Sequence, residues 1–270
     1  MSPRFAPPPV GRPAARVPWW LVALGALIAG AYLWIATDEG ARQVLGTLRR
    51  GLWITLLVTA TAFAASCLAG LALAAMALSR RRAAREAARF YTEIVRGIPI
   101  LVLLLYVAFV LTPALVSAWN WLGGWSGLPE ARTRDVPLLW RAVLALVIAY
   151  SAFVGEVFRA GLQSVDRGQV EAAAALGLRP WQRFRLIVLP QAIRTILPPL
   201  GNDLIAMVKD SSLVSVVGVM DIAQLGKVTA AGNFRYLETY SIVALMYLTI
   251  TLALGLALGR LERRLQARGR

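Results

Sequence analysis

Long stretches without a single charged residue most restrict how this chain can fold. Four of them exceed 20 residues, at 17–37, 51–79, 97–129 and 239–259. A helix needs about 20 apolar residues to cross the roughly 30 Å hydrocarbon core of a bilayer. Two similar stretches, 141–159 and 195–220, are apolar but interrupted by charged residues. The sequence therefore predicts an all-helical integral membrane protein with six spans.

The composition supports this reading and argues against several other classes. With 58% hydrophobic and 16% charged residues, the chain has too little polar surface for a soluble body of 270 residues. A nucleic-acid-binding protein can carry a net charge of +15, but not together with uncharged stretches of this length. Histidine is absent and Cys67 is the one cysteine, which argues against zinc sites, disulfides and catalytic triads.

The ends of two spans need further argument. Pro113 followed by Trp119, Trp121 and Trp125 predicts that the third span ends near residue 116, with an interfacial aromatic segment and a loop that closes at Pro137. The first stretch follows a basic leader and could be a signal peptide. It is longer than the roughly 7 to 15 residues of a signal core and lacks a small-residue cleavage site, which favours a retained anchor helix.

The distribution of Lys and Arg predicts the orientation. The N-terminal tail, residues 80–89, residues 159–194 and the C-terminal tail together hold 19 of the 29 basic residues, and the alternate loops hold 7. Basic residues concentrate in cytoplasmic loops. Both termini and the 160–194 loop are therefore predicted to be cytoplasmic.

The segment 164–191 carries helix start and stop signals. Asp166 can cap a helix N-terminus, and Gly177 with Pro180 beyond it predicts a left-handed C-terminal residue. A second helix is expected to begin near Trp181 and to be stopped by Pro190. Two functions remain open from the residues alone: insertion into a groove of another protein, or anchoring on anionic lipid.

A resemblance narrows this choice. Glu171-Ala172-Ala173, then Gly177, then Ile187 and Leu189-Pro190 resemble the EAA loop of permease subunits of ATP-binding-cassette (ABC) importers. The segments 91–99, 151–164, 189–193 and 209–215 resemble the branch that transports polar amino acids. Two positions depart from the family pattern, since Ile98 and Ser211 stand where threonine is usual.

The resemblance covers roughly residues 50–260 and implies a fold and partners. It implies the five-helix core of a type I importer permease at 51–260, with a coupling loop at 163–194. Residues 1–50 would add a cytoplasmic tail, one transmembrane helix and a periplasmic loop, and 261–270 a basic cytoplasmic tail. It also implies ATPase subunits, a second permease subunit and an amino-acid-binding protein as partners in the inner membrane. Contact with the ATPase would come from Glu171, Ala172, Ala173 and Gly177.

The chain carries no sequence for binding nucleotide phosphates. No G-x-x-x-x-G-K-[ST] pattern occurs, and Asp221 stands where the motif ending at Lys227 would need its first glycine. We therefore expect no ATPase site and no cofactor in this chain, with ATP and Mg²⁺ bound by a partner. An ion-coupled secondary carrier, or an importer of another small solute, remains the alternative. A membrane-embedded enzyme lacks a nucleophile or metal cluster beside its carboxylates, and a pure scaffold need not keep ionisable residues within a span.

Ionisable residues within the predicted spans are the candidate substrate contacts. Asp203 and Asp210 are seven residues apart and are expected on one helix face, whereas Lys209 points about 100° away from Asp210. They either line the substrate pathway or have structural roles, with Lys209 and Asp210 forming an ion pair or lying near the interface. Glu156 is expected to pair with Arg159, with a gating role as the alternative.

Overall fold

The computed structural model describes residues 19–126 and 129–267, and all regular structure in these ranges is helical. Predictions that involve Arg4, Arg12 and Arg16 lie outside the described residues. Five helical segments are long and apolar enough to cross a bilayer: α1 (Trp19–Thr37), α2 (Glu39–Ala77), the rod formed by α4 (Ile100–Tyr106) and α5 (Thr112–Ser126), α6 (Leu138–Gln163) and α11 (Tyr236–Ala267). These segments confirm the all-helical membrane fold.

The other helices are shorter or more polar. They are α3 (Arg82–Gly97), α7 (Arg167–Ala175), α8 (Pro180–Arg183), α9 (Leu189–Asp210) and α10 (Ile222–Asn233). α9 occupies the place of the sixth predicted span and packs against α2, α6 and α11. It is less apolar than the five segments above because it contains Asp203, Lys209 and Asp210.

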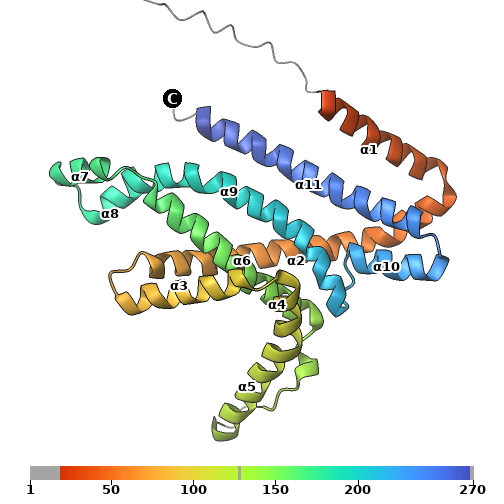
Figure 1. Cartoon of the computed structure of the whole chain (residues 1–270), viewed down its shortest axis with the longest axis horizontal. Coiled ribbons are helices and arrows are strands. Elements are labelled where there is room, and N and C mark those ends of the chain that lie inside the picture. Colours follow the sequence, from red (N-terminus) through yellow and green to blue (C-terminus); the bar gives the residue numbers. More distant parts are fainter. Residues whose placement is uncertain (1–18, 127–128, 268–270) are drawn as a thin grey trace, which may run out of the picture.

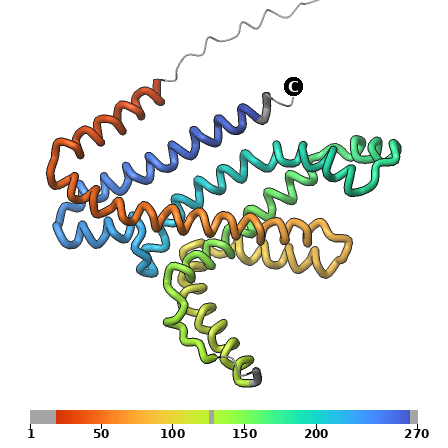
Figure 2. Tube along the Cα trace, turned by 180° about the vertical axis from the view of Figure 1, so that it is seen from behind, coloured from red at the N-terminus to blue at the C-terminus, as the bar shows by residue number. Residues whose placement is uncertain are grey.

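α2 crosses α6 near the centre of the molecule, as Figures 1 and 2 show from opposite sides. α9 and α11 lie on one side of this crossing, α3 lies on the other, and α5 projects away from the bundle. Gly70 and Gly155 form the contact between α2 and α6, where their backbones approach closely. The main core lies around the crossing and includes Val58, Leu104 and Leu146, all fully buried.

The two ends of the bundle carry different elements. α7 and α8 lie at the same end as the α2–α3 turn, whereas α10 and the α1–α2 turn lie at the opposite end. The expected loop before residue 51 is almost absent, because α2 begins at Glu39 directly after its capping residue Asp38. The side chain of Asp38 accepts a 2.7 Å hydrogen bond from the backbone N–H of Ala41, which explains this early start.

Two predicted helix ends at prolines are wrong. The third span continues past residue 116 to Ser126, and Pro190 does not stop the helix that begins at Pro180. In each case a wide π turn precedes the proline, at Val107–Leu111 and Phe184–Val188. A π turn changes the hydrogen-bond register, so the missing N–H of a proline in the next turn is accommodated without ending the helix. Pro198 and Pro199 likewise lie inside a continuous α9.

Two side chains stabilise the π turn at Val107–Leu111, one directly after it and one from α6. The hydroxyl of Thr112 donates to the carbonyl of Val107 at 2.7 Å. Arg141, which is buried, donates to the carbonyls of Ala108 and Val136 and to that of Thr133. Arg141 thus holds the start of α6 against the turn, and α6 begins directly after Pro137, where the loop was predicted to close.

Candidate functional site

The predicted coupling loop contains a short helix with defined caps. Asp166 accepts a 3.1 Å hydrogen bond from the backbone N–H of Gln169, which caps the start of α7 as predicted. Gly177 has φ +79°. Its N–H donates to the carbonyl of Ala174, and the N–H of Leu178 donates to that of Ala173. This pair of bonds is the Schellman motif, which requires a left-handed residue at the glycine position.

The four residues implied in coupling divide between an outer and an inner side. Glu171 and Ala172 are exposed, whereas Ala173 is buried and Gly177 forms the turn. Val170 of α7 packs against the apolar cluster of Val165, Ala192 and Ile196. The side chain of Gln191 in α9 donates to that of Gln169 in α7 at 2.7 Å. α7 is therefore fixed to the membrane helix on one side and open to a partner on the other.

Large apolar side chains surround the open side of this loop. Leu176 is 82% exposed, Trp181 is 65% exposed and Leu186 is 59% exposed. Trp181 stacks on Phe184 with ring centroids 5.8 Å apart. Exposed apolar groups beside a capped helix suit either protein docking or contact with lipid, the two functions left open by the sequence.

Of the α9 charges, Asp210 and Lys209 do not form the ion pair that was considered. Asp210 instead accepts a 2.7 Å hydrogen bond from the hydroxyl of Tyr150 in α6. Lys209 is exposed, and within residues 19–126 and 129–267 it has no carboxylate within ion-pair distance. Of the two structural roles expected for these residues, the ion pair is wrong, and a position of Lys209 near the membrane interface stays a prediction.

Asp203 faces the interior, and no residue that the structure describes forms a hydrogen bond or an ion pair with its carboxylate. Its side chain is near enough to Tyr150 and to Cys67 in α2 to interact with both electrostatically. One carboxylate oxygen is buried and accepts no hydrogen bond from any residue that the structure describes. Asp203 and Asp210 thus both act on Tyr150, in agreement with the predicted shared face. A buried carboxylate oxygen without a donor is costly unless water or a ligand supplies one.

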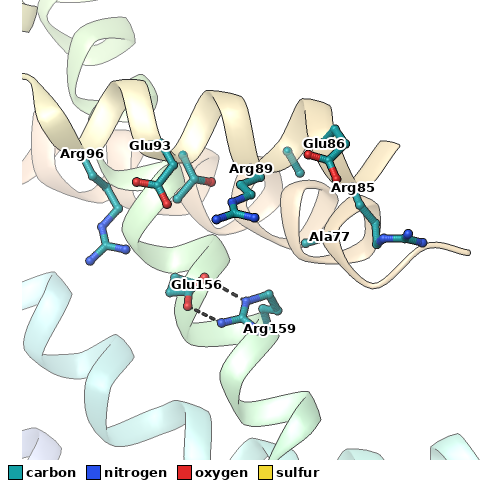
Figure 3. A pocket seen from close by; sticks show the side chains of 10 residues that line it. Ala77, Arg85, Glu86, Arg89, Glu93, Arg96, Glu156 and Arg159 are labelled. Atoms are coloured by element: carbon teal, nitrogen blue, oxygen red, sulfur yellow. Dashed lines mark hydrogen bonds and ion pairs between the residues drawn. The ribbon is translucent and has the colours of Figure 1, made fainter. Parts of the chain in front are cut away.

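Glu156 pairs with Arg159 as predicted. The Nε of Arg159 lies 2.9 Å from Oε2 of Glu156, and a second nitrogen contacts the other oxygen. Arg159 also donates to Gln163. The pair lies on α6 and faces α3 (Figure 3).

A charged cleft of about 350 Å³ lies between α3 and α6 (Figure 3). Its charged lining residues are Arg85, Glu86, Arg89, Glu93 and Arg96 from α3, and Glu156 and Arg159 from α6. The guanidinium of Arg96 lies 5.7 Å from the ring centroid of Phe153. We call this the α3–α6 cleft.

Two contacts hold the helices around the α3–α6 cleft together. Gly155, the neighbour of Glu156, touches Gly70 of α2. The hydroxyl of Tyr91 in α3 lies 2.8 Å from the hydroxyl of Ser151 in α6. The charged side chains of α3 that line the cleft are exposed, so the cleft is open at its surface.

Uncharged runs in the sequence do not reveal the arginines of α3 as candidate site residues. They place Arg89 in a loop and Arg96 at the edge of a span. A helical signal was present, since Arg85, Arg89 and Arg96 recur at helical spacing and Ala88 and Val95 form the buried side.

The sequence matches a known protein family and several of its members. A family model described as "binding-protein-dependent transport system inner membrane component" matches residues 66–267. The glutamine transport system permease protein GlnP of Escherichia coli (strain K12) is 37% identical over 228 residues, covering 84% of this chain and 92% of that protein. The arginine transport system permease protein ArtQ of Bacillus subtilis (strain 168) is 32% identical, covering 80% and 91%.

A solved structure extends the similarity to three dimensions. The crystal structure of an amino acid ABC transporter with histidines matches with a TM-score of 0.68 and 36% sequence identity. The match covers 81% of this chain and 94% of that chain. The helix arrangement described above is therefore that of a known transporter subunit.

Proposed function

Because the chain belongs to the family of binding-protein-dependent transport system inner membrane components, we propose that it imports a polar amino acid as the permease subunit of an ABC importer. It is a multi-pass inner-membrane protein with a type I importer fold. The relatives named for glutamine and arginine support an amino acid as the solute. The selected amino acid depends in part on a separate binding protein.

The exposed coupling helix carries this proposal. α7 is capped at both ends and presents Glu171 and Ala172 outward. The sequence has no phosphate-binding loop, so energy must enter from another subunit. We propose that two ATPase subunits, which bind ATP and Mg²⁺, dock on the α7–α8 hairpin of two permease subunits. A binding protein then delivers the amino acid on the opposite side, and closure of the ATPases switches access.

Vesicle uptake tests the proposal directly. The permease, its ATPase and its binding protein are reconstituted together, and uptake of labelled amino acids is measured with and without ATP. We expect uptake that requires ATP and persists when ion gradients are dissipated. Uptake that needs no ATP and disappears with the ion gradient would identify the secondary carrier instead.

We also propose that α7 faces the cytoplasm and α10 the opposite side. In a Cys67→Ser background, Leu176→Cys places a thiol on an 82% exposed side chain, and Gly232→Cys places one where a side chain meets nothing within 4 Å. A membrane-impermeant maleimide added outside intact cells should label Gly232→Cys and leave Leu176→Cys unlabelled until the membrane is opened. The reverse labelling pattern would contradict this orientation.

The unpartnered carboxylate of Asp203 supports a role in the substrate pathway. We propose that Asp203 and Asp210 line the route, with Lys209 on the outer face. Asp203→Asn removes a charge with little change of shape, so we expect the KM for uptake and substrate-stimulated ATP hydrolysis to change about tenfold, the effect of one charged hydrogen bond. Assembly with the ATPase should persist.

The neighbouring residue provides the control for Asp203. Asn202 is exposed and points about 100° away from Asp203 around α9, so Asn202→Ala should leave the KM unchanged. Transport kinetics that are the same in Asp203→Asn and the parent protein would remove Asp203 from the pathway.

A further inference from the structure

The α3–α6 cleft holds two charges, Arg89 and Glu93, that form no hydrogen bond or ion pair with any residue that the structure describes. We propose that it is an amino-acid-binding site on the inner half of the route, where Arg89 and Arg96 take the carboxylate and Glu93 takes the ammonium group. This inference rests on the proposed function and extends it, because it assigns a second binding position apart from Asp203.

The charges of the cleft divide into satisfied and free groups. Glu156 and Arg159 neutralise each other, and Arg85 donates to the backbone carbonyls of Ser79 and Arg80. Among the described residues, neither Arg89 nor Glu93 has a hydrogen bond or an ion pair, although they are four apart on one helix. The guanidinium of Arg96 contacts the Phe153 ring and keeps its N–H donors available.

These free groups lie together on one face of α3. Figure 3 shows Arg89, Glu93 and Arg96 extending from α3 toward the space above Glu156. Their positions at 89, 93 and 96 are one helical turn apart, so donors and acceptor alternate along the cleft. A ligand lying parallel to α3 would meet a positive, a negative and a positive group in order.

Because the cleft contains both positive and negative side chains, it favours a ligand that carries both charges. A simple cation would meet four arginines in this cleft, and a simple anion would meet three glutamates. An amino acid carries both charges within a few bonds, so each end can face its opposite. The cleft volume of about 350 Å³ lies in the range of about 300–1,000 Å³ that is usual for small-molecule sites, so it has room for an amino acid.

The position of the cleft gives this binding a place in transport. The charged side chains of α3 that line the cleft are exposed, so water or a ligand can reach them. A weak zwitterion site there would let the solute leave the α9 carboxylates without crossing an apolar layer. The site reads only the amino and carboxyl groups and is therefore expected to accept any amino acid that the route delivers.

Binding to the assembled permease–ATPase complex tests the proposal. Nucleotide-free complex in lipid nanodiscs carries Asp203→Asn throughout, which weakens the α9 position, and labelled glutamine binding is measured by equilibrium dialysis. Arg96→Gln and Arg89→Gln should each weaken binding about tenfold, as expected for loss of one charged hydrogen bond. Arg82→Gln, on the same helix but outside the cleft lining, should have no effect.

Modified ligands identify which end of the amino acid each residue holds. Glutaminamide, which lacks the carboxylate, should bind weakly and equally to the parent and to Arg96→Gln. N-acetylglutamine, which lacks the ammonium group, should bind weakly and equally to the parent and to Glu93→Gln. Equal glutamine affinity in all variants, or no binding at millimolar glutamine, overturns the cleft site. Failure of ATP-driven uptake of every amino acid would instead overturn the proposed function.

Discussion

Gly70→Val is expected to remove folded permease from the membrane. A side-chain carbon at Gly70 would lie 2.8 Å from the backbone nitrogen of Gly155 and 2.9 Å from a methyl carbon of Val154. Backbone atoms cannot move aside as a flexible side chain can, so α2 and α6 would have to separate. Overpacking in a core commonly costs about 1–3 kcal/mol, and a clash with backbone at the central crossing should exceed this range.

Detergent extraction measures this effect. We expect Gly70→Val to give little monodisperse protein after extraction and no uptake. Gly25→Val is the matched control, because it introduces the same side chain into an apolar helix where nothing lies within 4 Å. Equal yields of the two variants would show that the crossing does not depend on close approach at Gly70.

Gly177→Pro is expected to abolish ATP-driven uptake while the protein still inserts. Proline fixes φ near −65°, whereas Gly177 has φ +79° and donates its N–H to the carbonyl of Ala174. The substitution therefore removes the turn that ends α7 and displaces the helix from its partner. Uptake in vesicles and co-purification of the ATPase measure the loss, and membrane insertion is followed separately.

Gly177→Asn separates backbone shape from the loss of glycine itself. Asparagine tolerates the left-handed region, and no atom lies within 4 Å of the position where its side chain would begin. We expect it to retain most uptake. Glu171→Lys, which reverses an exposed charge on the same helix, should lower uptake without altering the fold. Full uptake in both Gly177→Pro and Glu171→Lys would refute the coupling role of the loop.

The capping residues in the sequence predicted both ends of α7, because these ends are set by neighbouring residues. Asp166 caps α7 and Gly177 ends it, and both interactions lie within a few residues of the chain. The paired charges Glu156 and Arg159 were predicted for the same reason. Interactions at a spacing of three or four residues follow from helix geometry alone.

Features that depend on distant partners were not predictable in this way. The helix continues through Pro113 because Thr112 and Arg141 supply donors to the carbonyls of the preceding turn, and Arg141 comes from another helix. Asp210 bonds to Tyr150, 60 residues away in sequence, and not to the adjacent Lys209. Uncharged runs in the sequence also do not reveal α3, whose charged side chains line the cleft.

The unbroken helical path from Pro180 to Asp210 has a mechanical consequence. At 1.5 Å per residue, a displacement at Pro180 is carried over about 35 Å to Asp203 and about 45 Å to Asp210. α7 is attached to the same helical path through Gln169 and Gln191. A movement of the coupling loop would therefore move α9 with it. The π turn at Phe184–Val188 is where the stiffness of this continuous helix would change.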